Sequence, residues 1–371
     1  MMIGRVAGFV RHPLKSVRWR IGSCFRQKPV KRYVASILAN ERLVGIDVGG
    51  ARGLLPHWQT LSGIAFFYLF EPHPESFKHL QDYVTKHEPA HLYKLLPMAL
   101  SGTGGTRTLQ LTNTPSGSTI LPFLKDGAGM EYIQQDYFFP IREVELETHT
   151  LKQIFEEVKE SRADLIKLDI QGAEFEVLAG FGEDRIQQLL LVEMEIGLQQ
   201  LYEGQKSFAE VDCFLRERGF DLFDVRVSRT HRPMNGDPAG YQEQVFSVYE
   251  DAPGISARLW EFDVIYFRNP KSLLMEKRKG EIRKLIVAYC TYNFFIEAFC
   301  LIEKAEGAEV FSESEADKVK EAIVGWYKRA HYSFIYRATP LGERLRSMLQ
   351  LFALKGHRRW AQHMWVNYPN G

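Results

Sequence analysis

Short apolar runs alternate with amphipathic stretches over residues 43–268, a pattern typical of strands that alternate with helices. Apolar runs predict strands near 43–47, 65–71, 92–97, 164–169, 188–195, 221–227 and 262–267. Helical spacing predicts helices near 53–62, 74–86, 150–160, 173–181 and 207–218. Alternation of this kind predicts an α/β fold with a mostly parallel sheet that helices cover on both faces.

Two long inserts interrupt this alternation. The first insert, 101–148, contains an alternating stretch at Thr108–Leu111 that is typical of an edge strand. The second insert, 228–256, is expected between the last two strands, near the ligand end of the sheet. Irregular segments of this length inside a compact domain are usually functional or disordered.

After residue 270 the pattern becomes helical and stays so to the end of the chain. We therefore expect three parts, with no catalytic residues in the last: a basic N-terminal extension over 1–40, an α/β domain over 41–270, and a helical C-terminal subdomain over 271–371.

Composition and charge exclude several functions. The hydrophobic share of 45% and the charged share of 25% are those of an ordinary globular protein. A net charge of +1 argues against a strongly basic nucleic-acid-binding protein. The charge is uneven, however, because no acid precedes Glu41, whereas nine Lys and Arg residues do. The basic piece 14–25 can pack on the core of the protein or lie on an anionic membrane surface.

The four cysteines show no metal-type spacing, which favours free thiols and a reducing compartment. No stretch is apolar enough for a membrane span, and the N-terminus lacks the apolar core of a signal peptide. We expect a cytoplasmic protein, with peripheral contact at the inner face of the membrane as the other possibility.

The strand-end stretch Val44–Gly53 carries the first chemical signal. Its apolar run ends in Asp47, and glycines follow at positions 49, 50 and 53. Glycines allow a ligand to approach the backbone closely, and ligands of open α/β sheets bind at the carboxyl ends of the strands. A dinucleotide site needs G-x-G-x-x-G directly after the strand, for pyrophosphate. An acid there would repel pyrophosphate but can bind an ammonium group, so the order favours S-adenosylmethionine over NAD.

Three further strands bring carboxylates to the same edge. Glu71 follows the second strand and can accept both ribose hydroxyls of an adenosine cofactor. Asp169 ends the strand at 164–169, and Glu193 and Glu195 lie in the next one. Each acid alone can be a solvated strand-end residue. Several acids at one edge indicate a site that binds cations, protons or hydroxyls.

Together these segments resemble the FkbM-type S-adenosylmethionine-dependent methyltransferases. The resemblance covers roughly residues 41–227 and extends more weakly to 268. The matching segments are Asp47–Gly53, Phe70–Phe77, Ala99–Ser101, Ser116–Thr119, Val144–Leu151, Lys167–Leu178, Glu193–Glu195 and Leu201–Tyr202. The resemblance implies a seven-strand Rossmann-like methyltransferase sheet whose last strand is antiparallel. It also implies O-methylation of hydroxyls on sugars of surface glycans or on natural products.

The resemblance further implies a cofactor site. The residues at the methionine, ribose and adenine parts of S-adenosylmethionine would be, in chain order, Asp47, Gly49, Gly50, Gly53, Glu71, Pro72, Met98, Ala99 and Asp169. One departure from the family pattern is Arg52, which places an extra cation near the cofactor and leaves its orientation open.

Methyl transfer from a sulfonium is an in-line displacement, so the acceptor oxygen must be aligned with the methyl group. A general base, or a divalent metal that lowers the pKa of the acceptor hydroxyl, would assist. Asp169 is the first candidate base, because it ends its strand beside the predicted sulfonium. Glu195 and Glu193 can join it as bases or as ligands of Mg²⁺. We favour chemistry without a metal and assign no metal site. Alternative bases, each more typical of a surface or capping residue, are His73, His149 and His231.

The leading hypothesis is an O-methyltransferase acting on a sugar hydroxyl of a glycan. The inserts and the helical tail would form the acceptor site, and the basic N-terminus would suit a lipid-linked or acidic acceptor. Alternatives are a methyltransferase for natural-product hydroxyls, a catalytically inactive scaffold protein, and an NAD-linked enzyme. A nucleic-acid methyltransferase is disfavoured, because no basic and aromatic stripe crosses the core. The oligomeric state stays open.

Overall fold

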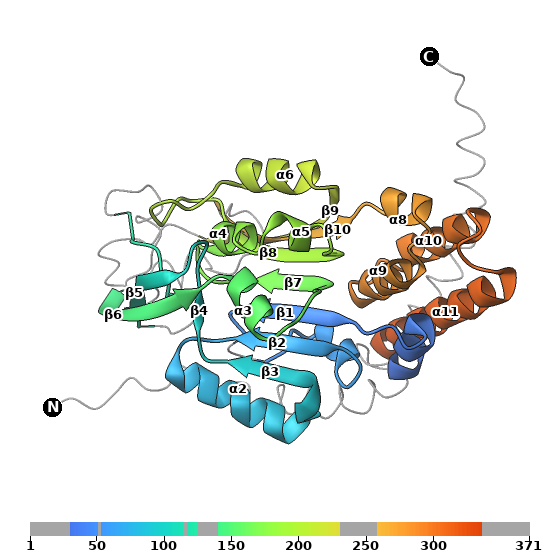
Figure 1. Cartoon of the computed structure of the whole chain (residues 1–371), viewed down its shortest axis with the longest axis horizontal. Coiled ribbons are helices and arrows are strands. Elements are labelled where there is room, and N and C mark those ends of the chain that lie inside the picture. The colour runs from blue at the N-terminus through green and yellow to red at the C-terminus, as the bar shows by residue number, and fades with distance from the viewer. Residues whose placement is uncertain (1–29, 51–52, 114–116, 125–139, 231–257, 336–371) are drawn as a thin grey trace, which may run out of the picture.

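The structure is a computed structural model that describes residues 30–50, 53–113, 117–124, 140–230 and 258–335. A central sheet carries helices on both faces (Figure 1). Its strands, in spatial order, are β3 (Tyr93–Leu96), β2 (Phe66–Phe70), β1 (Val44–Val48), β7 (Leu165–Leu168), β8 (Leu191–Gly197), β10 (Arg258–Arg268) and β9 (Phe220–Thr230). The last described strand, β10, runs antiparallel to β8 and β9, while the other neighbours in this sheet are parallel. The predicted α/β sheet with an antiparallel last strand is confirmed.

Side chains of one face of the sheet pack against four helices. These helices are α3 (Leu151–Glu157), α4 (Glu174–Ala179), α5 (Glu183–Ile186) and α6 (Phe208–Glu217). Successive side chains of a strand point to opposite faces, and in β1 Val44 and Ile46 face these helices. Because β1 is buried along its whole length, its apolar run is continuous rather than alternating.

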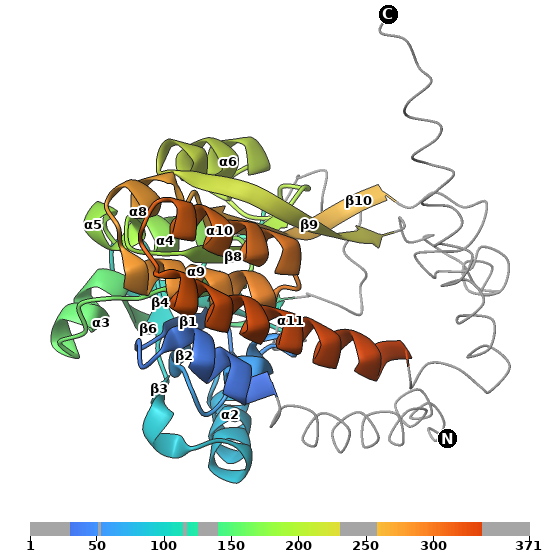
Figure 2. The ribbon, with the colours of Figure 1, turned by 90° about the vertical axis from the view of Figure 1, so that its right-hand side faces the viewer.

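The other face is covered by helices from both ends of the described chain. They are helical residues 30–38, η1 (Trp58–Leu61), α2 (Pro74–His87), α8 (Lys271–Met275), α9 (Lys279–Thr291), α10 (Phe295–Gly307) and α11 (Glu313–Ile335). Figure 2 shows α9, α10 and α11 gathered on this face. One hydrophobic cluster joins them to the sheet, so the helices after residue 270 share its core. A separate subdomain boundary at residue 270 stays a prediction.

Helix α9 is buried from Ile282 to Thr291, although this stretch contains two cations. Lys284 Nζ lies 3.1 Å from Oδ1 of the fully buried Asp164, and Arg283 donates to the carbonyl of Ile37 at 2.8 Å. These contacts explain how charged residues can occupy an otherwise apolar helix, because buried charges need partners.

The first insert forms a second, smaller sheet. Its strands, in spatial order, are β4 (Ala99–Leu100), β6 (Pro140–His149) and β5 (Gly105–Thr112). Strand β5 contains Thr108–Leu111 and lies at the edge, as predicted. Most of the second insert, 231–257, lies outside the described residues. The described strands that flank it, β9 and β10, meet it at the carboxyl edge of the parallel strands.

The predicted helix over 53–62 is wrong. Only one 3-10 turn, η1, forms there within the described residues. Gly53 adopts a φ of +78°, and Pro56 lacks a backbone N–H, so neither suits a continuous helix. The basic piece 14–25 and the tail 336–371 lie outside the described residues. None of the described helices combines the length and the apolar character needed to cross a membrane.

Candidate active site

The sheet register aligns three charged residues on one face. Asp47 of β1 pairs with Lys167 of β7, and Lys167 pairs with Glu193 of β8. Paired residues of adjacent strands point to the same side. This is the side that α9 covers, because Leu165 and Leu191, two residues earlier, belong to its hydrophobic cluster. A charged row therefore crosses the carboxyl ends of three strands.

Lys167 lies between two of the predicted acids. Its Nζ is 3.4 Å from Oδ1 of Asp47 and 3.2 Å from Oδ2 of Asp169, and its side chain is only 8% exposed. Although burial opposes the charge, Asp47 and Asp169 raise the pKa of Lys167 above its ordinary value. Sequence reasoning gave this residue no role. A lysine inside the apolar run Leu165–Leu168 was nevertheless a signal, because a buried strand lysine needs a partner.

Asp47 is 1% exposed, yet neither of its carboxylate oxygens forms a hydrogen bond with a described residue. The contact with Lys167 is an ion pair at 3.4 Å rather than a formed hydrogen bond. Burial raises the pKa of Asp47, and repulsion from Asp169 and Glu193 adds to the effect, while Lys167 opposes it. Buried polar groups normally find partners, so these oxygens are available to a ligand that donates hydrogen bonds.

The glycine turn after β1 brings two strand ends into backbone contact. The N–H groups of Gly49 and Gly50 both donate to the carbonyl of Phe70, at 3.0 and 3.2 Å. Gly49 has a φ of +88°, and a Cβ on it would lie 2.1 Å from the carbonyl oxygen of Asp169. Gly53 has a φ of +78° and lies against the ring of Tyr83. Only glycine fits positions 49 and 53 without strain. Arg52 lies outside the described residues.

Glu71 lies at the same edge of the sheet, directly after β2. Its Oε1 accepts a hydrogen bond from the N–H of His73 at 2.8 Å, and burial raises its pKa. Pro72 is half-buried beside it. Met98 and Ala99 follow β3, and the described contacts of Met98 are with the hydrophobic cluster of the opposite face.

Glu193 belongs to a buried network that the sequence did not predict. Its Oε2 accepts from the Tyr292 hydroxyl at 2.5 Å and lies 3.3 Å from Nε2 of His57. Its Oε1 lies 3.6 Å from Arg226. The indole of Trp58 donates to the Tyr292 hydroxyl at 2.8 Å. Although burial opposes ionisation, His57 and Tyr292 lower the pKa of Glu193. No sequence spacing could have indicated Tyr292, because it is 99 residues from Glu193.

Glu195 is held by the turn that follows β7. Its Oε2 accepts from the amide of Gln171 at 2.8 Å, and the Tyr202 hydroxyl donates to the other end of that amide at 3.2 Å. Burial raises the pKa of Glu195 well above its ordinary value, and repulsion from Asp169 and Glu261 adds to it. Gln171 has a φ of +58°, an uncommon conformation that is typical of functional turns.

Glu174 stabilises this turn through hydrogen bonds to its backbone. Its carboxylate accepts from the backbone N–H of Ile170 at 2.9 Å and of Gly172 at 2.9 Å. Burial raises its pKa to about 7, against the opposing effect of these backbone donors. The turn therefore keeps the Gln171 side chain, and with it Glu195, in one position.

Of the three histidines considered as alternative bases, two lie in the part of the chain that the structure describes. His73 caps α2, because its Nδ1 accepts from the N–H of Ser76 at 3.5 Å. His149 ends β6 and pairs with Leu100 in the second sheet. His231 lies outside the described residues. Among the described side chains, no group of three or more His, Cys, Asp or Glu is arranged to hold a metal ion.

The edge can bind a cation that donates hydrogen bonds. Asp47, Glu71, Asp169 and Glu195 converge there, and Lys167 is the buried cation among them. Burial also raises the pKa of Asp263 on β10 to about 6, with repulsion from Glu193 and Asp169. Carboxylates that repel one another in this way would be stabilised by an added positive charge.

Comparison with known proteins agrees with the resemblance that the sequence shows. Residues 47–222 match the family model described as the methyltransferase FkbM domain, which confirms the resemblance seen in the sequence. The methyltransferase sdnD of Sordaria araneosa is 26% identical over 169 residues, which is 41% of this chain and 63% of that protein. The chain therefore spans less than two thirds of that relative.

Solved structures give weaker likenesses. Magnesium protoporphyrin IX methyltransferase from Synechocystis PCC 6803 has a TM-score of 0.30 and 11% identity, over 71% of this chain and 88% of that one. A human methyltransferase 10 domain containing protein has a TM-score of 0.27 and 13% identity, over 72% and 83%. At such low structural similarity, the fold is identified from the strand order of the sheet itself.

Proposed function

We propose, from the match of residues 47–222 to the methyltransferase FkbM domain, that the protein transfers a methyl group from S-adenosylmethionine to a sugar hydroxyl of a glycan. The observation that carries the cofactor assignment is the buried Asp47, whose carboxylate oxygens have no hydrogen-bond partner among the described residues. The ammonium group of the cofactor's amino-acid end is a donor of the charge and type that these oxygens require.

The residues at the edge fit this cofactor in two further respects. Gly49 lets the turn after β1 pack directly on the backbone of Asp169, which keeps Asp47 and Asp169 close together at one edge. Glu71 presents a carboxylate at the end of the neighbouring strand, where it can accept from ribose hydroxyls. When bound, the cofactor supplies a methyl group on a positively charged sulfur.

Of the three predicted acids, Asp169, Glu193 and Glu195, the last is the best candidate for the general base. A base is most effective when its pKa lies near the working pH, and the pKa of Glu195 is raised. Asp169 is paired with Lys167 at 3.2 Å, so its carboxylate already has a cationic partner and is more suited to orienting the acceptor. Glu193 is engaged by Tyr292, His57 and Arg226, so it is suited to positioning. Glu195 would take the proton of the acceptor hydroxyl.

A sugar acceptor agrees with the charge of this edge. The converging carboxylates would repel a polyanionic nucleic acid, whose binding depends on basic residues. They can accept hydrogen bonds from the neutral hydroxyls of a sugar. Peripheral contact of the basic N-terminus with a membrane or a lipid-linked acceptor is a further part of the proposal, and most of that segment, residues 1–29, lies outside the described ones.

The test is methyl transfer with a radiolabelled methyl group on the cofactor. The protein would be incubated with a panel of neutral and acidic oligosaccharides. Label that stays on the glycan after mild alkali is a methyl ether, whereas label lost in alkali is a carboxyl ester. We expect alkali-stable label and a large loss of rate in Glu195→Gln. Cofactor binding without label on any glycan, or with alkali-labile label only, would overturn the assignment.

A further inference from the structure

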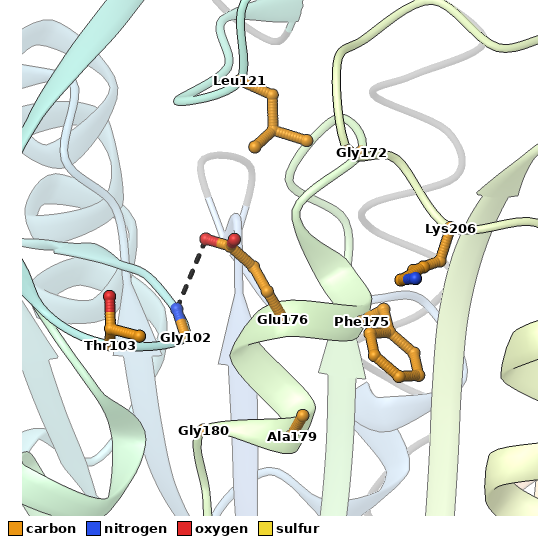
Figure 3. A pocket seen from close by; sticks show the side chains of 10 residues that line it. Gly102, Thr103, Leu121, Gly172, Phe175, Glu176, Ala179, Gly180 and Lys206 are labelled. Carbon is orange, nitrogen blue, oxygen red and sulfur yellow. Dashed lines mark hydrogen bonds between the residues drawn. The ribbon is translucent and has the colours of Figure 1, made fainter.

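A cavity lies beside the turn that follows β7. It has a volume of about 410 Å³, within the range of small-molecule sites. Figure 3 shows α4 between the β4–β5 turn on one side and the segment before α6 on the other. The lining residues are Gly102, Thr103, Leu121, Gly172, Phe175, Glu176, Ala179, Gly180, Gly204 and Lys206. None of them belongs to the residues assigned to the cofactor.

The cavity lining combines an aromatic ring, a carboxylate and an ammonium group. Phe175 offers one aromatic ring, and Lys206 Nζ lies 5.9 Å from the centre of that ring (Figure 3). Across the cavity, Glu176 Oε1 accepts from the N–H of Gly102 at 3.3 Å. Lys206 is also paired with Glu210 at 2.8 Å. One acid and one neutralised cation do not favour an anion such as phosphate. They favour a neutral ligand that has hydroxyl groups and one apolar side.

Glycines bring the backbone itself to the cavity wall. A Cβ on Gly180 would lie 2.6 Å from the carbonyl oxygen of Gly102, so the end of α4 and the β4–β5 turn pack backbone against backbone there. Both glycines line the cavity, so their peptide groups form part of its wall. No side chain at Gly102 or Gly180 then fills the space.

Gly172 joins the cavity to the candidate active site. It lines this cavity and also a small neighbouring pocket that Gln171, Glu195 and Tyr202 share. A Cβ on Gly172 would lie 2.5 Å from the ring of Tyr202. The cavity and the small pocket of the proposed base therefore share the wall formed by Gly172.

We propose that this cavity binds a neutral sugar unit of the acceptor glycan, next to the unit that receives the methyl group. The proposal rests on the proposed function, because it assumes a glycan acceptor. The ring of Phe175 would pack on the apolar face of the sugar. Glu176, Lys206 and the peptide groups of Gly102 would bind its hydroxyls.

The test blocks the cavity and measures glycan binding directly. Ala179 is an exposed residue of α4 that lines the cavity, so Ala179→Trp fills it without disturbing the core. Glu157→Trp, at an exposed position of α3, is the matched control. Lys206→Ala is a second, milder variant. Fluorescently labelled full-length protein would be applied to an array of neutral, uronic-acid and phosphorylated oligosaccharides, with melting temperatures measured in parallel.

We expect the unmodified protein and Glu157→Trp to bind a subset of neutral oligosaccharides of two or more units. Ala179→Trp should bind them at least tenfold more weakly, and Lys206→Ala several-fold more weakly. Equal binding by Ala179→Trp, no binding to any glycan, or binding to phosphorylated glycans only would overturn the subsite. Array binding needs no methyl transfer, so a protein that binds glycans but not S-adenosylmethionine would refute the proposed function and leave the subsite standing.

Discussion

Lys167 and Asp47 lie opposite each other in adjacent parallel strands, with Nζ of Lys167 3.4 Å from Oδ1 of Asp47. Both side chains are buried, and the same Nζ lies 3.2 Å from Asp169. Lys167 thus forms ion pairs with both Asp47 and Asp169. Of these two acids, Asp47 has no hydrogen bond within the described residues. Lys167 compensates the charge of Asp47, and the carboxylate oxygens of Asp47 remain available to a ligand.

Removing the cation tests that arrangement. Lys167→Met leaves Asp47 buried without its partner, which should lower the free energy of unfolding by about 3–5 kcal/mol. The double variant with Asp47→Asn should recover part of this loss, because the uncompensated charge is gone. Urea unfolding measures both, with the exposed Lys318→Met as the control. Losses in the two single variants that simply add, within about 0.5 kcal/mol, would mean that the residues are not coupled.

Adjacent glycines give a matched pair of variants. Gly49→Ala should reduce stability strongly and weaken cofactor binding, because its Cβ would lie 2.1 Å from the Asp169 carbonyl and φ is +88°. Gly50→Ala should fold normally, since its nearest neighbour, Cγ of Asp47, is at an ordinary 3.5 Å. Thermal unfolding compares the stability of the two variants through their melting temperatures. Similar melting temperatures would show that the turn relaxes around a side chain.

The Tyr292 hydroxyl links α9 to the polar row of the sheet. Tyr292→Phe removes the donor to Glu193 and the acceptor of the Trp58 indole, so two buried groups lose a partner. We expect a loss of about 1–3 kcal/mol in the free energy of unfolding. Tyr33→Phe, which loses only an exposed contact with Arg32, should change little. If both variants unfold at the same denaturant concentration as the unmodified protein, the network does not contribute to stability.

Glu174 gives the protein a characteristic pH dependence. Its folded pKa of about 7 is raised above the ordinary 4.5, so the folded state binds the proton more tightly than the unfolded state. Its contribution to stability is full below pH 4.5 and is lost as the pH rises through 7, an effect of roughly 3 kcal/mol. Glu174→Gln should flatten the fall in stability over this window. The exposed Glu156→Gln should leave it intact. Unchanged curves for Glu174→Gln would contradict the raised pKa.

Much of the fold could be predicted because buried parallel strands are continuous apolar runs. Those runs also placed Asp47, Asp169 and Glu195 at strand ends, and strand ends of parallel sheets share one edge. The helix over 53–62 failed because composition there suits a helix, while Gly53 and Pro56 break it.

Contacts between distant segments could not be predicted. Tyr292 and Trp58 meet across 234 residues, and only the packing of α9 on the sheet brings them together. The cavity beside α4 is likewise formed by segments that are far apart in sequence, so no local pattern indicates it.

Equilibrium binding of S-adenosylmethionine tests the central claim most directly. Isothermal titration of the full-length protein should give a dissociation constant between about 1 μM and 1 mM, the usual range for enzyme ligands. Asp47→Asn should weaken binding at least tenfold, whereas Asp184→Asn, at an exposed position of α5, should not. A folded protein with no measurable affinity for S-adenosylmethionine or S-adenosylhomocysteine, or equal affinity in Asp47→Asn, would contradict the assignment of this edge as the cofactor site.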